Sequence, residues 1–494
     1  MYTPGCHLLC HDDVIGSRRV SWILYLLDPD CSWKPEYGGA LRLYPTNHVE
    51  VAGGEKVKVP QPDFTVSIPP AWNQLSFFTV QPGESFHDVE EVYRRQQHEK
   101  EEDDGGRIRM AISGWFHIPQ HGEDGYEEGL EEQLAEKSSL AQLQGGKADI
   151  FDEPQPHWVD NPHWEEQAKT EDDEMTADEI DFLIKYMNPN YLVPDTVEEL
   201  SKLFSDESSL RLAEFLSPKF CTRLRSYLES KDHESNPSLP ANPLYKDSSE
   251  VGVARPPHKH RYLYRKAVQP IETTYPDAES LTPYDDLVDI LFPHPAFTKW
   301  ISLVTGITLT KSNIYARRFR RGMDYTLATA YEEEDPQLEI CLGITPSRGW
   351  GDEEDDDEEE EAEQNGMSTK MNGKSAQQPS KPQEEVGGYE MYMAGEDDEG
   401  MDIGIGSSEF STHTGAGQRR KAKADPAVYK SAGDDEDDGI LFSQPAAWNN
   451  LAIVLRDRGV LRFTKYVSKA AKGDRWDVCG EYGVEFGEDE DDED

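Results

Sequence analysis

The chain has 494 residues with 98 acidic and 49 basic side chains, which gives a formal net charge of −49. Much of this charge lies in blocks: ten consecutive acidic residues at 352–361 and seven at 488–494. Blocks of like charge repel themselves and favour disorder. The charge argues against a nucleic-acid partner bound through its phosphates and is compatible with a basic protein partner.

The six cysteines show no CxxC spacing, and we find neither a signal-peptide pattern nor an apolar run of about eighteen residues, the length a membrane span needs. These features predict a reduced intracellular protein without a membrane span. Cys6-His7 and Cys10-His11 are possible zinc ligands, but closed zinc sites usually use two separated pairs of such ligands. We therefore predict ordinary buried thiols.

The first segment, 2–27, places His11 and Asp13 directly before an apolar run that predicts a buried strand. In an extended chain, residues two apart point to the same side, so this imidazole and this carboxylate can bind one metal ion. A second, distant histidine would complete the two-His-one-carboxylate face that leaves positions open on Fe(II). His-x-Asp alone is a weak signal, because solvated turns contain it too.

The next segments strengthen this hypothesis. A strand is predicted at 75–80, a turn at Pro82-Gly83, and His87 opens the following segment. The sequence RIRMAISGWFH (107–117) predicts a strand whose alternate positions share one face: Arg109, Ala111, Ser113 and Trp115. This order of His-x-Asp, strands, His and a basic residue is the order expected of a 2-oxoglutarate oxygenase, in which an arginine pairs bidentately with the distal carboxylate of the co-substrate.

Together with Tyr2, the motifs LLCHDD, ILYL, GGALRLY, PAWNQLSFF, SFHDVEEV and RMAISGWFH resemble the prolyl 3-hydroxylases that modify a small-subunit ribosomal protein, the fungal termination-and-polyadenylation protein family and its animal relatives. The resemblance covers residues 1–118 and, more loosely, the C-terminal part. It implies iron ligands at His11, Asp13 and His87. It also implies that Arg109 binds the distal carboxylate of 2-oxoglutarate and that the phenols of Tyr2 and Tyr25 hydrogen-bond to it.

The same resemblance implies Fe(II), 2-oxoglutarate, O2 and ascorbate as cofactors and co-substrates, and 3-hydroxylation of a proline, with dihydroxylation left open. The expected substrate is a basic ribosomal small-subunit protein, with an effect on translation termination, no direct nucleic-acid contact and no membrane. Nucleus and cytoplasm are the expected locations. Family members begin well before this chain does, so we expect an N-terminal truncation. An insertion at 93–106 leaves Arg107 as an alternative to Arg109.

The predicted fold is mainly β with helices, built as two double-stranded β-helix (jelly-roll) domains, the first catalytic and the second degenerate and non-catalytic. The Gly38-Gly39 pair predicts a bulge or a close backbone approach. The predicted domains are a catalytic domain at 1–122, an acidic helical connector at 123–190, a second domain at 191–345 plus 438–487, a disordered acidic insertion at 346–437 and an acidic tail at 488–494. The insertion contains a basic cluster at 418–423 that is compatible with nuclear import, or with chance.

Helices are predicted from periodicity and capping signals. The pattern at 124–143 is helical and strongly acidic, and capping boxes at Thr176/Glu179 and Thr196/Glu199 precede apolar runs. A further helix is predicted at 210–228, broken by Pro218.

The sequence also repeats itself: PAAWNNLAIVLRD (445–457) echoes PPAWNQLSFFTV (69–80), which indicates a duplicated barrel. The counterparts of the first metal-ligand pair are then Ala330 and Glu332. In the first copy His87 lies fifteen residues after Trp72, and in the second copy the residue fifteen after Trp448 is Phe463. The second copy is therefore predicted to bind no iron.

Two alternatives stay open. Nucleic-acid dealkylases carry a second arginine six residues after the co-substrate arginine, and this chain has Trp115 there. A non-enzymatic alternative is a binding scaffold with the same two-barrel fold, whose first barrel does not catalyse.

Overall fold

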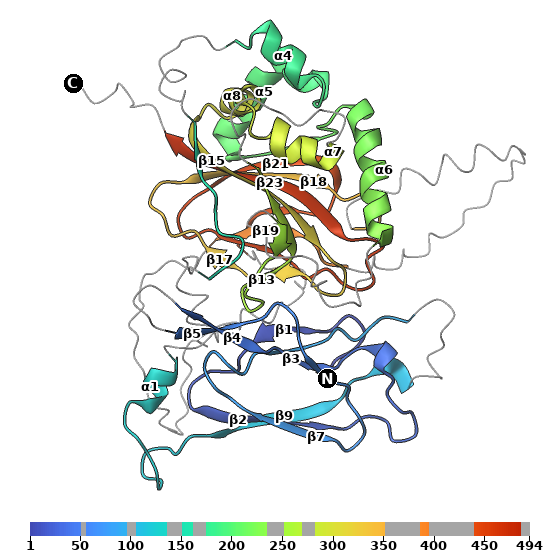
Figure 1. The fold of residues 1–494 in the computed structure, drawn as a ribbon, viewed down its shortest axis with the longest axis vertical. Helices are drawn as coiled ribbons and strands as arrows, with labels where there is room; N and C mark the ends of the chain where they lie inside the picture. Colours follow the sequence, from blue (N-terminus) through green and yellow to red (C-terminus); the bar gives the residue numbers. More distant parts are fainter. Residues whose placement is uncertain are drawn as a thin grey trace, which may run out of the picture.

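The computed structural model describes residues 1–50, 56–95, 105–135, 151–161, 174–234, 251–268, 282–350, 386–394 and 439–485. Within these ranges the chain is mainly β with few helices, as predicted, and its two halves are stacked along the longest axis (Figure 1). The acidic blocks at 352–361 and 488–494 and the basic cluster at 418–423 lie outside the described residues. None of the described helices is long and apolar enough to cross a membrane.

The first half forms two antiparallel sheets, one above the other (Figure 1). The strand order is β1-β8-β3-β6 in one sheet and β7-β2-β9 in the other. The strands are β1 (Leu8–His11), β2 (Arg18–Tyr25), β3 (Leu41–Leu43), β6 (Val66–Ile68), β7 (Leu75–Thr79), β8 (His87–Val89) and β9 (Ala111–His117), with a hairpin of β4 (Thr46–Glu50) and β5 (Lys56–Pro60). Short β-rich runs separated by Gly and Pro turns account for these strands.

The second half contains an eight-stranded sheet and a four-stranded sheet. The larger has the path β11-β21-β18-β23-β15-β14-β12 with β10 paired to β15, and the smaller has the order β17-β22-β19-β20. The strands are β10 (Val159–Asp160), β11 (Ser209–Ala213), β12 (Val251–Val253), β13 (His260–Arg261), β14 (Leu263–Lys266), β15 (Thr308–Phe319), β16 (Tyr325–Thr326), β17 (Thr329–Ala330), β18 (Gln337–Ile344), β19 (Glu390–Met393), β20 (Ile440–Gln444), β21 (Trp448–Arg456), β22 (Leu461–Thr464) and β23 (Arg475–Glu485).

The two halves pair their strands in the same order. In the first half β2 lies between β7 and β9, and in the second half β18 lies between β21 and β23. Likewise β8 pairs with β1 and β3, while β22 pairs with β17 and β19. Asn73 and Asn449, from the repeated Trp-Asn motif, both have positive φ, at 55° and 57°. The sequence repeat therefore coincides with equivalent places in two equivalent sets of strands.

A glycine pair marks the same close approach in each half. A Cβ atom on Gly38 would lie 2.0 Å from the carbonyl oxygen of Glu91, so the predicted close backbone approach is confirmed. In the second half, a Cβ atom on Gly387 would lie 1.9 Å from the carbonyl oxygen of Tyr466. Both glycines also have positive φ, so no other residue fits there without strain.

Replacing Gly387 with alanine should lower the free energy of unfolding by about 2–5 kcal/mol, from left-handed strain and a backbone clash together. Gly459 is the matched control, because its φ is +83° and no atom lies within 4 Å of the position that an added methyl group would take. Alanine at Gly459 should cost only the strain, about 1–2 kcal/mol. Denaturant titration of both variants measures the difference, and equal losses would contradict the close approach.

The helices are α1 (Leu130–Ala135), α4 (Ala177–Leu183), α5 (Pro194–Glu207), α6 (Pro218–Glu234), α7 (Pro283–Asp285) and α8 (Pro295–Thr305). The capping box of Thr176 and Glu179 is confirmed at the start of α4. The second predicted capping box is wrong: α5 begins at Pro194, with Val193 as its N-cap, so Thr196 is already inside the helix. Proline is well placed at the first helical position, where its missing N–H costs nothing.

The predicted helix at 210–228 is wrong in its first part. Residues 209–213 form β11, in which Leu210 and Leu212 are buried and Arg211 is exposed, so the burial has the period of a strand. Pro218 does not break a helix but begins α6. Of the acidic helix predicted at 124–143, residues 130–135 form α1 and 136–143 lie outside the described residues. The prediction is wrong for 124–129, which are described and are not helical.

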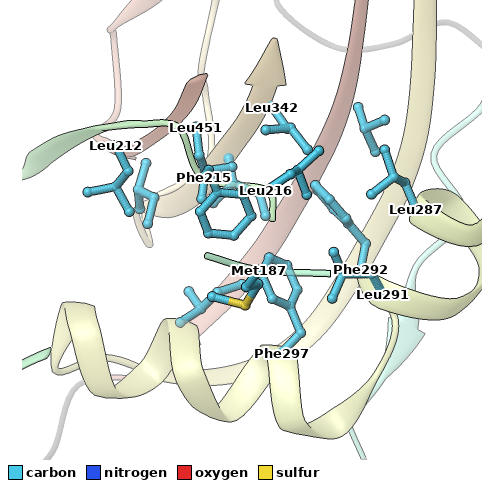
Figure 2. Close-up of a cluster of buried hydrophobic side chains, with 14 of the residues drawn as sticks. Met187, Leu212, Phe215, Leu216, Leu287, Leu291, Phe292, Phe297, Leu342 and Leu451 are labelled. Carbon is cyan, nitrogen blue, oxygen red and sulfur yellow. The ribbon is translucent and has the colours of Figure 1, made fainter. Parts of the chain in front are cut away.

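The main hydrophobic core lies between the helices and the eight-stranded sheet of the second half (Figure 2). Phe297 of α8 lies on the helical side, and Leu342 of β18 and Leu451 of β21 lie on the sheet side. All three are fully buried, and each such side chain stabilises the fold by about 1.5–3 kcal/mol. The second half is therefore held by its own extensive core.

The predicted disordered insertion, 346–437, contains ordered structure. Residues 390–393 form β19, which pairs with β20 and β22, and Trp350 is buried at 2% exposure. The prediction of disorder is wrong for these residues. It depended on the average composition of 346–437, which two short buried segments between long polar stretches hardly change. Residues 346–349, 386–389 and 394 are also described. The rest of the insertion lies outside the described residues.

Candidate metal centre

Three predicted side chains converge in the first half. His11 ends β1 and His87 begins β8, and these two residues lie opposite each other in the sheet. Nε2 of His11 lies 3.3 Å from Oδ1 of Asp13, and Nε2 of His87 lies 3.6 Å from Oδ2. One ligand atom from each residue lies within 4.8 Å of the others. This arrangement brings two imidazoles and one carboxylate within reach of a single ion.

Backbone carbonyl groups orient both imidazoles. Nδ1 of His11 donates to the carbonyl oxygen of Leu9 at 2.7 Å, and Nδ1 of His87 donates to that of Ser85 at 2.8 Å. Because a carbonyl oxygen only accepts, the proton of each neutral ring is on Nδ1, and each Nε2 presents its lone pair to the centre. Burial, with the neighbouring His11, lowers the pKa of His87 to about 4. His87 is therefore neutral at physiological pH, the form in which histidine binds metals.

Asp13 reaches the centre in a way the sequence did not predict. The prediction assumed an extended chain from His11 to Asp13, but β1 ends at His11 and Asp13 has φ of +61°. Aspartate is among the few residues that adopt this left-handed conformation at modest cost. The pair thus shares a metal-sized site because of a turn, not because of strand alternation.

Trp115 and Arg18 support the carboxylate. Nε1 of Trp115 donates to Oδ2 of Asp13 at 3.2 Å, and the guanidinium of Arg18 lies 3.7 Å above the Trp115 ring. Burial alone would raise the pKa of Asp13, but the neighbouring His11 and His87 and the hydrogen bond from Trp115 outweigh it and lower the pKa. Sequence reasoning placed Trp115 on the face of Arg109 but missed this contact.

Arg109 lies beside both predicted phenols. It pairs with Tyr2 through two backbone hydrogen bonds of 2.9 Å, and its guanidinium carbon lies 5.0 Å from the ring centres of Tyr2 and Tyr25. Its Nε donates to the carbonyl oxygen of Gly39 at 2.8 Å, and Nη2 donates to the Tyr25 hydroxyl at 3.3 Å. The side chain is 2% exposed, yet no carboxylate among the described residues pairs with it. A buried guanidinium of this kind favours an anionic ligand.

Arg107, the alternative, has other contacts. Its Nη1 donates to the carbonyl oxygens of Tyr93 and Arg94, both at 3.1 Å, and its guanidinium lies 4.3 Å from the ring centre of Tyr37. The structure thus groups Arg109, and not Arg107, with the predicted tyrosines. Burial raises the pKa of Tyr2 and of Tyr25, so both stay protonated and can donate to a carboxylate.

Two family models match this sequence. The model described as the 2OG-Fe(II) oxygenase superfamily matches residues 1–117, and the one described as oxoglutarate and iron-dependent oxygenase degradation C-term matches residues 178–491. The second match alone covers more than half of the chain. The chain belongs to the 2-oxoglutarate- and iron-dependent oxygenases.

Two named relatives agree with this membership. The prolyl 3,4-dihydroxylase OGFOD1 of Ostreococcus tauri is 30% identical over 492 residues, which cover 98% of this oxygenase and 76% of the relative. The prolyl 3-hydroxylase OGFOD1 of Mus musculus is 29% identical over 243 residues, 49% of this oxygenase and 33% of the relative. A solved prolyl-4-hydroxylase of Pseudomonas putida is 10% identical with a TM-score of 0.29, covering 58% of this oxygenase and 97% of that chain.

The donor set of the oxygenase fits the iron that its family uses. Two neutral imidazole nitrogens and one carboxylate form the facial ligand set typical of non-haem Fe(II). The zinc alternative gains no support. Among the described residues, Cys6, His7 and Cys10 do not belong to any group of three or more ligand atoms that lie within 4.8 Å of one another. Cys10 is buried beside Tyr44 and Phe86, as an ordinary thiol.

The second half of the oxygenase lacks this set. Ala330 lies opposite Leu461 in the sheet, as His11 lies opposite His87. The predicted counterparts Ala330 and Phe463 lie on β17 and β22, and neither side chain is a metal ligand. Neither Ala330 nor Leu461 can bind a metal.

A second metal-sized group, Cys341, Asp477 and Cys479, lies in the second half. Its carboxylate is already paired, because Asp477 accepts from Arg317 at 2.7 Å and from Arg475 at 3.0 Å. Added positive charge beside two guanidinium groups is unfavourable. This group therefore belongs to a buried ion-pair network.

The two halves use equivalent arginines differently. In the shared strand register Asp477 is equivalent to Ala111. Arg475 and Arg109 each lie two residues before these positions, so they are equivalent too. Both arginines donate to the carbonyl oxygen of the second glycine of a Gly-Gly pair. Arg475 is neutralised by Asp477 and by Glu390, at 3.0 and 3.3 Å. The first half keeps the arginine without such carboxylates among the described residues.

Proposed function

We propose that this oxygenase hydroxylates a prolyl residue of a protein substrate, at C3, once or twice. The names of the relatives, a prolyl 3,4-dihydroxylase and a prolyl 3-hydroxylase, support the choice of proline. The observation that carries the proposal is the convergence of both Nε2 atoms with the carboxylate of Asp13. In this proposal His11, Asp13 and His87 hold Fe(II), and Arg109, Tyr2 and Tyr25 hold the distal carboxylate of 2-oxoglutarate.

When bound, iron with 2-oxoglutarate and O2 supplies the oxidation of an unactivated C–H bond, coupled to decarboxylation to succinate. The protein contributes orientation. The carbonyl groups of Leu9 and Ser85 keep both Nε2 atoms unprotonated, and Trp115 fixes one carboxylate oxygen of Asp13. Phe78 packs against His87 with ring centres 4.5 Å apart, which helps to exclude water beside the site.

Further parts of the proposal rest on the family resemblance and on charge. The substrate is a basic protein of the small ribosomal subunit, ascorbate keeps the iron reduced, and the protein acts on translation termination in nucleus and cytoplasm. The net charge of −49 complements a basic substrate. Each half is a double-stranded β-helix domain, and the second is non-catalytic, which the non-ligating side chains at the predicted counterparts Ala330 and Phe463 support.

The test is turnover with synthetic proline-containing basic peptides, Fe(II), 2-oxoglutarate and ascorbate. Succinate release together with a hydroxylated peptide, located to C3 by fragmentation and NMR, is the expected result. Succinate release without any modified peptide would leave the oxygenase chemistry and remove the proline assignment.

Replacing Arg109 with alanine should raise the apparent KM for 2-oxoglutarate by about 30- to 5000-fold, because losing a buried charged partner costs about 2–5 kcal/mol. The apparent affinity for iron should change much less. Arg107→Ala is the matched control, and its KM for 2-oxoglutarate should stay close to the wild-type value. If Arg107→Ala raises this KM and Arg109→Ala does not, the two assignments must be exchanged.

A further inference from the structure

The second half packs against the far face of the sheet that carries the two histidines (Figure 1). Adjacent residues of a strand point to opposite faces. Cys10 precedes His11 and Phe86 precedes His87, and both preceding side chains are almost fully buried, at 1% and 2% exposure. The contacts of the second half fall on these residues, directly behind the metal centre.

Tyr325 of β16 holds the strand that ends at His11. The backbone N–H of Cys10 donates to the Tyr325 hydroxyl at 3.2 Å, and that hydroxyl donates to the carbonyl oxygen of Pro257 at 2.7 Å. Leu9, whose carbonyl orients the His11 ring, packs in a buried cluster with Tyr325, Leu327 and Tyr466. The peptide bond between Leu9 and Cys10 is thus held by a residue 315 positions away in sequence.

His258 takes the corresponding role behind His87. Its ring stacks on Phe86, with centres 4.7 Å apart and planes 21° apart, and both rings are buried. Phe86 lies between Ser85, whose carbonyl orients the His87 ring, and His87 itself. For each of the two histidines, a side chain of the second half therefore contacts the residue that precedes the histidine in sequence.

A buried carboxylate fastens this contact between the halves. Glu91, just beyond β8, is 0% exposed and accepts from the Ser468 hydroxyl at 2.6 Å and from the Lys469 backbone N–H at 2.7 Å. The His7 ring packs against the Tyr466 ring, with ring centres 4.0 Å and planes 31° apart. Buried hydrogen bonds of this kind have narrow geometric tolerance, so the second half cannot slide along the sheet without leaving polar groups unpaired.

We propose that Tyr325 and His258 are positioning residues of the metal centre, through which the non-catalytic half sets the relative placement of His11 and His87. This inference rests on the proposed function, because it takes these histidines as the iron ligands. It gives the second half a task in the reaction, although that half holds neither histidine of the centre. The Tyr325 hydroxyl acts on His11 through Cys10 and Leu9, and the His258 ring acts on His87 through Phe86.

The test is Mn2+ binding to the full chain, measured by calorimetry without 2-oxoglutarate, O2 or turnover. Tyr325→Phe should weaken Mn2+ binding by about 10-fold or more, the usual effect of losing a group that orients metal ligands. Tyr392→Phe is the matched control: it also removes a buried phenol hydroxyl, which donates to Glu339 at 2.8 Å within the second half. It should leave Mn2+ affinity unchanged, even where its melting temperature falls as far as that of Tyr325→Phe.

His258→Leu provides a second, independent variant and should also weaken Mn2+ binding. In the Co2+-loaded protein, the visible absorption bands should shift in both interface variants and not in Tyr392→Phe, since these bands report ligand geometry. Equal Mn2+ affinity in wild type, Tyr325→Phe and His258→Leu would overturn the inference. An equal loss of affinity in Tyr325→Phe, His258→Leu and the control Tyr392→Phe would overturn it as well. The absence of Mn2+ binding by wild type itself would instead overturn the proposed iron site.

Discussion

Replacing His87 with alanine is expected to abolish 2-oxoglutarate turnover and to leave the chain folded. In the proposed site His87 supplies one of three ligand atoms, and a site with one imidazole and one carboxylate no longer has the facial set typical of non-haem Fe(II). We expect succinate release to fall by at least about 100-fold, because even groups behind the ligands cost 10- to 100-fold when removed. The stabilisation of the protein by Mn2+ in thermal melting should disappear together with turnover.

His117→Ala is the matched control for this change. His117 lies on β9 in the same half of the chain, and its ring is hydrogen-bonded to Ser17 at 2.9 Å, but it is not part of the metal-sized group. Its removal should leave turnover and the Mn2+ effect close to wild type. Equal background turnover by wild type and His87→Ala, with both proteins folded, would leave the non-enzymatic scaffold as the remaining hypothesis.

The residues of the candidate site could be found in the sequence because each is part of a local motif. His11 and Asp13 are two residues apart, His87 opens a segment after a Pro-Gly turn, and Arg109 opens the strand motif RMAISGWF. The geometry that joins them could not be found, because it depends on a single backbone torsion at Asp13 and on a tryptophan from another strand. Neither leaves a periodic signal in the sequence.

The errors elsewhere have the same origin. β11 was taken for part of a helix because a five-residue strand ahead of a real helix extends the apolar pattern, and tertiary pairing with β21 decides its conformation. β19 was missed because its four residues lie between long polar stretches. In each case, contacts far apart in sequence overrode local composition.

β19 matters because it brings Glu390 into the centre of the second half. Glu390 is 1% exposed and pairs with Arg317 at 3.0 Å, with Arg462 at 2.8 Å and with Arg475 at 3.3 Å. Burial alone would raise the pKa of Glu390, but these three guanidinium groups outweigh it and hold the pKa well below its ordinary value. One carboxylate thus balances positive charge from three separate strands.

Glu390→Gln should therefore lower the free energy of unfolding by about 3–5 kcal/mol, because removing one partner leaves buried charge uncompensated. Glutamine keeps the size of the side chain, so the loss measures charge more than packing. Glu198→Gln is the matched control: its ion pair with Lys202 in α5 is about two-thirds exposed, with 69% and 71% of the side chains accessible. Exposed pairs contribute little to stability, so this variant should melt close to wild type.

The pH dependence separates charge from any loss of packing. A carboxylate whose pKa is lower in the folded state stabilises the fold above its ordinary pKa, 4.5 for this group, and that stabilisation is lost as the pH falls below 4.5 toward the folded value. The difference in unfolding free energy between wild type and Glu390→Gln should thus be full at neutral pH and should shrink on acidification below 4.5. Urea titrations at neutral and acidic pH measure it. A difference that stays constant over this range would show that Glu390 stabilises the second half through packing and not through its charge.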